Sequence, residues 1–313
     1  MPAEPDRLSV DAQSAGLIAH LHGAVPPAPD WFDRAIAVAP ERARLTVDGA
    51  GIDMLAWGRR GDPGLLLLHG NGAHAEWWSF IAPFFAETHR VAALSWSGMG
   101  GSDWRDRYHA STFANEAIAA AEAAGLFEGP RPPVFVAHSF GGFLALYCAA
   151  RFGERLGGVA IVDSPIEPPG ATPDRPPPRH RPNRVYPTFE EALGRFRLAP
   201  PQTCDNLYAI DYIARRSIKA VEGGYTWKFD PFIWREFELG DPTPLLQRPA
   251  CPLALMWGER SGLMRPEIVR YMAGIAPPAS PKIAIPDADH HVMLDQPLAF
   301  VAAVRALLAG WPA

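Results

Sequence analysis

The stretch from residue 133 to 150 places the strongest constraint on the fold. It opens with an apolar run at 134–137 that is typical of a buried strand and ends just before Ser139. Two glycines follow at 141 and 142, and a helical pattern covers 143–150. A serine in a sharp strand-to-helix turn has its hydroxyl raised above the sheet, beside the free N–H groups of the helix's first turn. The stretch therefore predicts an α/β fold with Ser139 as candidate nucleophile, the alternative being a serine that only caps the helix.

Apolar runs and helical patterns alternate through most of the chain. Such alternation indicates a mostly parallel, doubly wound sheet with helices on both faces and the site at the carboxyl ends of the strands. The other predicted strands are 44–47, 52–57, 65–68, 91–94, 158–162, 253–257 and 282–285. The other predicted helices are 111–125, 189–196, 206–221, 266–273 and 297–308.

The alternation stops between residues 165 and 248. Eight prolines between residues 168 and 187 exclude a helix or a central strand there and are equally consistent with a surface loop. We therefore predict an N-terminal extension (1–40), a core (41–164 and 249–313) and an inserted, mainly helical cap (165–248).

The residues around Ser139 resemble the nucleophile elbow Gly-x-Ser-x-Gly of the α/β-hydrolases, with Ala137 in place of the first glycine. The resemblance covers about residues 44–312 and implies the α/β-hydrolase fold, with a cap over the nucleophile. It also implies a catalytic triad in the chain order serine, acid, histidine.

A second motif resembles the oxyanion loop of the same family. The sequence His69-Gly70-Asn71-Gly72 matches the family's His-Gly-x-Gly, which implies the backbone N–H groups of Asn71 and Phe140 as oxyanion-hole donors. The resemblance gives His69 a supporting role within this loop. A glycine turn before a helix also suits phosphate, but no Gly-Lys-Ser/Thr follows it.

The candidate base lies near the C-terminus. The block from Asp289 to Pro297 is similar to the family's Gly-His-x-x-x-x-Glu-x-Pro, with Asp289 and Asp295 at the glycine and glutamate positions. This implies His290 as the base, with the neighbouring His291 as the alternative.

The acid departs from the commonest family pattern. Ser261 stands where most members carry the acid, and a serine cannot supply the negative charge. Certain haloalkane dehalogenases and the zearalenone lactonase group place the acid after the strand that follows the nucleophile helix. The matching residue is Asp163, which would be costly to bury unpaired at the end of an apolar strand and whose natural partner is a histidine. Glu259 remains the alternative acid.

Aromatic residues are candidates for the substrate pocket. Trp77 and Trp96 lie near predicted strand ends, and Trp227 belongs to an aromatic cluster in the predicted cap. Aromatic side chains are equally ordinary core residues.

Composition and charge bear on the partners and the compartment of the protein. A net charge of -5 gives no reason to expect nucleic acid or an anionic membrane as a partner. Three widely separated cysteines argue against a disulfide framework and favour a reducing cytoplasm. We see neither a signal peptide nor an apolar run of membrane-spanning length, so we expect a cytoplasmic protein. The sequence leaves open whether it is a monomer or a homodimer.

The residues together predict a serine hydrolase that cleaves a small carboxylic ester or lactone through an acyl-enzyme on Ser139, without metal or organic cofactor. A carbon–carbon bond hydrolase of the same fold is one alternative. A non-catalytic ligand-binding homologue is the other, favoured only by Ser261 at the usual acid position.

Overall fold

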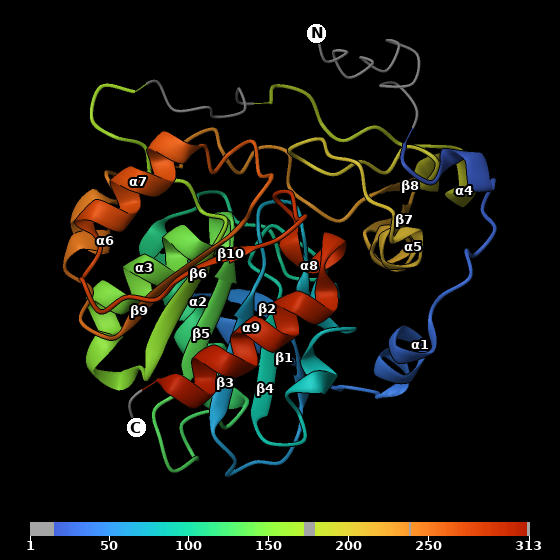
Figure 1. Ribbon diagram of the computed structural model, residues 1–313. Helices are drawn as coiled ribbons and strands as arrows, with labels where there is room; N and C mark the ends of the chain where they lie inside the picture. Colours follow the sequence, from blue (N-terminus) through green and yellow to red (C-terminus); the bar gives the residue numbers. More distant parts are fainter. Residues whose placement is uncertain (1–15, 172–178, 238, 312–313) are drawn as a thin grey trace, which may run out of the picture.

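A mixed sheet forms the centre of the molecule (Figure 1). The computed structural model describes residues 16–171, 179–237 and 239–311, and within them the sheet has eight strands in the order β1-β2-β4-β3-β5-β6-β9-β10. The strands are β1 (Glu41–Val47), β2 (Ala50–Trp57), β3 (Gly64–Leu68), β4 (Arg90–Leu94), β5 (Val134–His138), β6 (Gly158–Val162), β9 (Leu253–Gly258) and β10 (Lys282–Ile285). Within the described part of this sheet, only the β1–β2 and β2–β4 pairings are antiparallel.

Helices cover both faces of this sheet, and further helices lie in the segments outside it. They are α1 (Asp30–Ala37), α2 (Ala110–Ala123), α3 (Phe140–Phe152), α4 (Phe189–Leu193), α5 (Leu207–Arg216), α6 (Thr243–Gln247), α7 (Pro266–Ile275), α8 (Val292–Asp295) and α9 (Pro297–Gly310). Short 3-10 helices are η1 (Ala19–Leu21), η2 (Ala75–Trp78), η3 (Ala82–Phe84) and η4 (Gly153–Arg155). Helices α2, α3 and α7 contribute to the core on one face, and α5 and α9 to the core on the other.

Burial on both faces explains why the central strands are continuous apolar runs. In β3, Leu65 and Leu67 enter one core cluster while Leu66 and Leu68 enter the other, and all four are fully buried. Since successive side chains of a strand point to opposite faces, a strand covered on both sides needs apolar residues at every position.

Strand order places the site. The chain passes from β3 to β4 on one side of β3 and then returns to β5 on its other side. The carboxyl ends of β3 and β5 therefore flank a topological switch point, where crevices form in open α/β sheets. The loop at 69–72 follows β3, and Ser139 follows β5.

Segment 165–248 contains α4, α5, α6 and a hairpin of β7 (Ile218–Val221) with β8 (Gly224–Trp227). The predicted helix over 206–221 is therefore wrong beyond Arg216, because Gly223, with φ 81°, turns the chain back into a hairpin. The chain after β8 is fixed to the core, since Asp230 N donates to Gly98 O at 2.7 Å.

The N-terminal segment is described from residue 16 onwards. A weak helical pattern in the sequence at residues 10–21 falls partly outside the described residues, and η1 covers its end. Phe32 of α1 packs against Phe80 and Tyr208, which fixes this segment to the core and to α5. No helix in the described ranges has both the length and the apolar character needed to cross a membrane.

Candidate active site

Ser139 occupies a strained turn between β5 and α3. Its φ of 55° and ψ of -121° lie in a region that non-glycine residues rarely adopt. The two following glycines are required by space: a Cβ on Gly141 would lie 2.6 Å from His69 O, and one on Gly142 would lie 2.0 Å from Ser164 Oγ. The turn leaves the Ser139 side chain half-buried, so its hydroxyl remains reachable.

Three residues from separate loops form one hydrogen-bonded chain. His290, in the loop between β10 and α8, has Nε2 at 3.0 Å from Ser139 Oγ. Its Nδ1 lies 2.7 Å from Oδ1 of Asp163, which follows β6 directly. Asp163 is completely buried and His290 is 3 % exposed, so the pair is shielded from water. Shielding strengthens the electrostatic coupling between them.

Two further donors hold the Asp163 carboxylate. Ser261 Oγ donates to Oδ1 at 2.7 Å, and the backbone N–H of Gly258 donates to Oδ2 at 2.9 Å. The serine that stands at the usual acid position thus serves the displaced carboxylate. Sequence reasoning missed this contact, for which the only signal is a hydroxyl at 261 together with a carboxylate at 163. Glu259, the alternative acid, is exposed.

The loop after β3 lies directly against Ser139. A Cβ on Gly70 would be 3.0 Å from Ser139 Cβ, a tighter contact than side chains ordinarily make. His69 fixes the loop, because its Nδ1–H donates to Gly70 O at 2.7 Å and its Nε2 accepts from Trp96 N at 3.1 Å. Within the described part of the chain, the backbone N–H groups of Asn71 and Phe140 have no acceptor.

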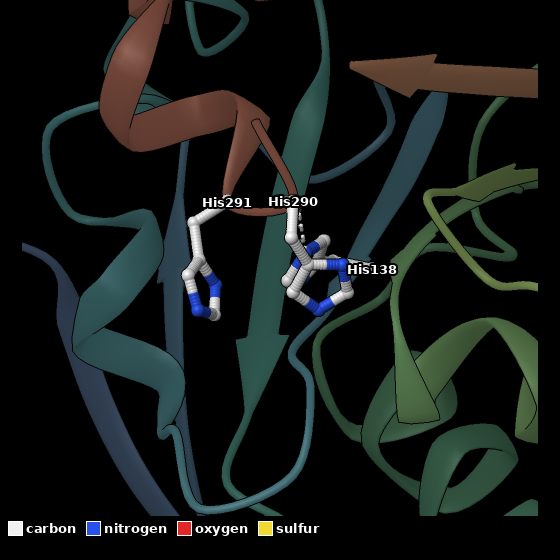
Figure 2. A group of neighbouring side chains, drawn as sticks. All are labelled: His138, His290 and His291. Atoms are coloured by element: carbon white, nitrogen blue, oxygen red, sulfur yellow. Dashed lines mark hydrogen bonds between the residues drawn. The ribbon is translucent and has the colours of Figure 1, made fainter. Parts of the chain in front are cut away.

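Two more histidines surround His290 (Figure 2). His138 Nε2–H donates to the backbone carbonyl of His290 at 2.9 Å, so its ring holds the backbone of residue 290. His291 is 5 % exposed, and neither of its ring nitrogens has a partner among the described residues. Burial lowers the pKa of His138 and of His291 well below the ordinary value, so both are neutral at pH 7.

Segment 202–206 holds the loop that carries His290. Gln202 Nε2 donates to both oxygens of Asp295 at 3.0 and 2.9 Å, and its Oε1 accepts from His291 N at 2.9 Å. Asn206 Nδ2 donates to Leu294 O at 2.8 Å. Sequence reasoning missed Gln202, because an amide in a proline-flanked segment has no motif. The position of His290 therefore depends on the predicted cap as well as on the core.

A comparison with known protein families finds a match over most of the chain. The model of the alpha/beta hydrolase family matches residues 65–304, from β3 to the middle of α9. The chain belongs to the alpha/beta hydrolase family. The match supports a hydrolase, without distinguishing among possible substrates.

Several solved structures share the α/β-hydrolase fold with this chain. A thioesterase domain from the curacin biosynthetic pathway is 23% identical, with a TM-score of 0.68, covering 87% of this chain and 99% of that one. The esterase Rv0045c from Mycobacterium tuberculosis is 19% identical, with a TM-score of 0.66, covering 99% and 100%. E-2-(Acetamidomethylene)succinate hydrolase is 17% identical, with a TM-score of 0.69, covering 87% and 100%.

The three tryptophans expected around the substrate lie in different settings in this α/β-hydrolase. Trp77 is nearly buried, its ring 5.4 Å from that of His291. Trp227 is half-buried and packs against Tyr186 and Phe196 of its own segment. Trp96 is fully buried, and its Nε1–H donates to His69 O at 2.9 Å. The expectation that Trp96 lines a pocket is corrected, because this side chain supports the loop after β3 from within the core.

We expect acid to destabilise this α/β-hydrolase through His69. Burial lowers the pKa of His69 from 6.5 to about 4, so the unfolded chain takes up a proton at a higher pH than the folded one. Stability is therefore lost as the pH falls from about 6.5 towards 4. His69 should account for about 2 kcal/mol of this loss between about pH 7 and pH 5. Urea unfolding of wild type and His69→Gln at both pH values measures it: the variant should lose about 2 kcal/mol less, and equal losses would contradict the assignment.

Proposed function

We propose that this α/β-hydrolase cleaves a carboxylic ester or lactone through an acyl-enzyme on Ser139. The observation that carries the proposal is the hydrogen-bonded chain from Ser139 Oγ through His290 to Asp163. A nucleophilic serine, a base within hydrogen-bond reach and a carboxylate that orients the base are the parts that acyl transfer requires.

The first half-reaction follows from the tautomer that Asp163 selects. Its carboxylate accepts Nδ1–H, which leaves the Nε2 lone pair of His290 directed at Ser139 Oγ. Nε2 takes the hydroxyl proton while Oγ attacks the substrate carbonyl. The oxyanion is held by the unpaired N–H groups of Asn71 and Phe140. The tetrahedral intermediate then collapses: the bond to the leaving oxygen breaks, and His290 gives that oxygen its proton.

The second half-reaction uses the same groups. Water loses a proton to His290 Nε2 and attacks the acyl carbon, and the bond to Ser139 Oγ breaks as His290 returns the proton to it. Asp163 stays ionised throughout and stabilises the imidazolium, assisted by the donors Ser261 and Gly258. The non-catalytic alternative loses its one supporting feature, because a carboxylate reaches His290 despite the serine at 261.

Covalent labelling tests the proposal. An organophosphonate that mimics the tetrahedral intermediate should add once per chain, and peptide mapping should place the adduct on Ser139. Heat-unfolded protein should stay unlabelled, because its serines lack the base and the oxyanion donors. A panel of nitrophenyl esters and lactones should then reveal a substrate that the untreated protein hydrolyses and the labelled protein does not. A folded protein, verified by circular dichroism, that remains unlabelled would contradict the proposal.

A further inference from the structure

Three imidazole rings from two segments lie close together (Figure 2), and one of them, that of His290, is within 3.0 Å of Ser139 Oγ. His138 ends β5, while His290 and His291 are adjacent in the loop before α8. One ring nitrogen of each residue lies within 4.8 Å of the others, and the ring centroids are 4.7, 4.8 and 5.3 Å apart. In a tetrahedral site with bonds near 2 Å, ligand nitrogens lie about 3.3 Å apart. Side-chain rotations that move each ring nitrogen by about 1 Å would bring the three nitrogens to that spacing.

Two of the rings already have the outer partners that metal-binding histidines need. Such a histidine usually donates its second N–H to a carboxylate or a backbone carbonyl, which fixes the ring. His290 donates Nδ1–H to Asp163 at 2.7 Å, and His138 donates Nε2–H to the carbonyl of residue 290 at 2.9 Å. Each keeps its other nitrogen as a lone pair.

The third ring supplies an independent observation. Both nitrogens of His291 are buried without a partner in the described ranges, although buried polar atoms nearly always have one. An unpartnered imidazole beside two others, with one carboxylate next to the group, suits a divalent cation of borderline softness. Magnesium and calcium prefer oxygen ligands and do not fit.

We propose that His138, His290 and His291 form a binding site for a divalent transition-metal ion such as Zn²⁺, and that occupation of this site blocks hydrolysis. Hydrolysis would stop because of one atom. Nε2 of His290, at 3.0 Å from Ser139 Oγ, carries the lone pair that accepts the serine proton. A metal bound there removes the base. Inhibition rests on the proposed function, whereas binding does not.

Calorimetric titration of the wild-type protein with ZnCl₂ tests the binding, with MgCl₂ as the comparison cation. We expect one Zn²⁺ per chain, no Mg²⁺ binding, and an X-ray absorption spectrum of the zinc complex with imidazole nitrogen ligands. His291→Phe and, separately, His138→Asn should each weaken Zn²⁺ binding at least about tenfold. His109→Gln, which changes an exposed histidine without a side-chain cap bond, should bind as wild type.

The inhibition is measured with an ester identified by the substrate panel. Zn²⁺ should abolish turnover, EDTA should restore it, and the inhibitory concentration should rise at least about tenfold in His291→Phe. Circular dichroism verifies that each variant is folded. If a variant unfolds, the X-ray absorption spectrum of the wild-type zinc complex still decides which kind of side chain binds the metal. Unchanged Zn²⁺ affinity in both variants, or a zinc spectrum without three imidazoles, would overturn the site. If the protein binds zinc but hydrolyses no compound of the substrate panel, the result counts against the proposed function alone.

Discussion

Ser139→Ala is expected to lower kcat for ester hydrolysis by about 10⁵-fold or more, with KM little changed. The alanine has no oxygen to form the acyl-enzyme, while the binding surface and the free N–H groups of the oxyanion loop remain. Stability should change little, because an alanine at this position must adopt the same backbone conformation, with φ 55°, as the serine. Steady-state kinetics on the best substrate of the panel measure the effect, and the variant should also lose the phosphonate adduct.

Ser111→Ala is the matched control for this experiment. Ser111 lies in the first turn of α2, is half-buried and forms no side-chain hydrogen bond that the structure shows, so its variant should keep wild-type kcat and labelling. A Ser139→Ala enzyme within about tenfold of wild type would exclude the serine mechanism.

The central strands could be predicted because burial leaves them no alternative composition. The unbroken apolar run at 65–68 predicts a strand, and β3 is Gly64–Leu68 with alternate leucines in the two cores. The turn at Ser139 also shows its requirement in the sequence, because an added Cβ at 141 or 142 would lie 2.6 Å from His69 O or 2.0 Å from Ser164 Oγ, and only glycine lacks that atom. Such positions carry their structural reason in the residue itself.

Other features depend on tertiary contacts that have no local pattern. The helical periodicity continues past Arg216, yet the chain there forms β7, whose hairpin with β8 is extended by an isolated bridge between Tyr186 and Tyr225. Trp96 lies near a strand end as a pocket residue would, but only the folded chain shows its N–H on His69 O. Local propensity cannot decide between such settings.

The acid position shows what chain order leaves open and strand order decides. Two carboxylates, Asp163 and Glu259, were plausible partners for the base. Because β6 lies between β5 and β9 in the sheet, a residue just after β6 has the nucleophile turn on one side and the loop at 258–261 on the other. Asp163 occupies this place, whereas Glu259 points to solvent.

Asp163→Asn is expected to lower kcat by about 10³- to 10⁴-fold while the protein remains folded. The wild-type carboxylate accepts from three donors: the His290 ring, the Ser261 hydroxyl and the Gly258 amide. An asparagine amide accepts on one atom only, so whichever way it is turned an N–H₂ group faces a donor. If the amide N–H₂ faces His290, it favours the tautomer with the proton on Nε2, which cannot take the proton of Ser139.

Graded variants separate this effect from simple loss of structure. Ser261→Ala removes one donor and keeps the charge, so kcat should fall only about tenfold. Glu259→Gln changes an exposed carboxylate and should leave kcat unchanged. kcat over a range of pH measures all three, and Asp163→Asn should stay slow at every pH because the missing charge, which stabilises the imidazolium, is not restored by base. If Glu259→Gln were inactive and Asp163→Asn active, the acid would have to be reassigned to Glu259, against the contacts that hold Asp163 on His290.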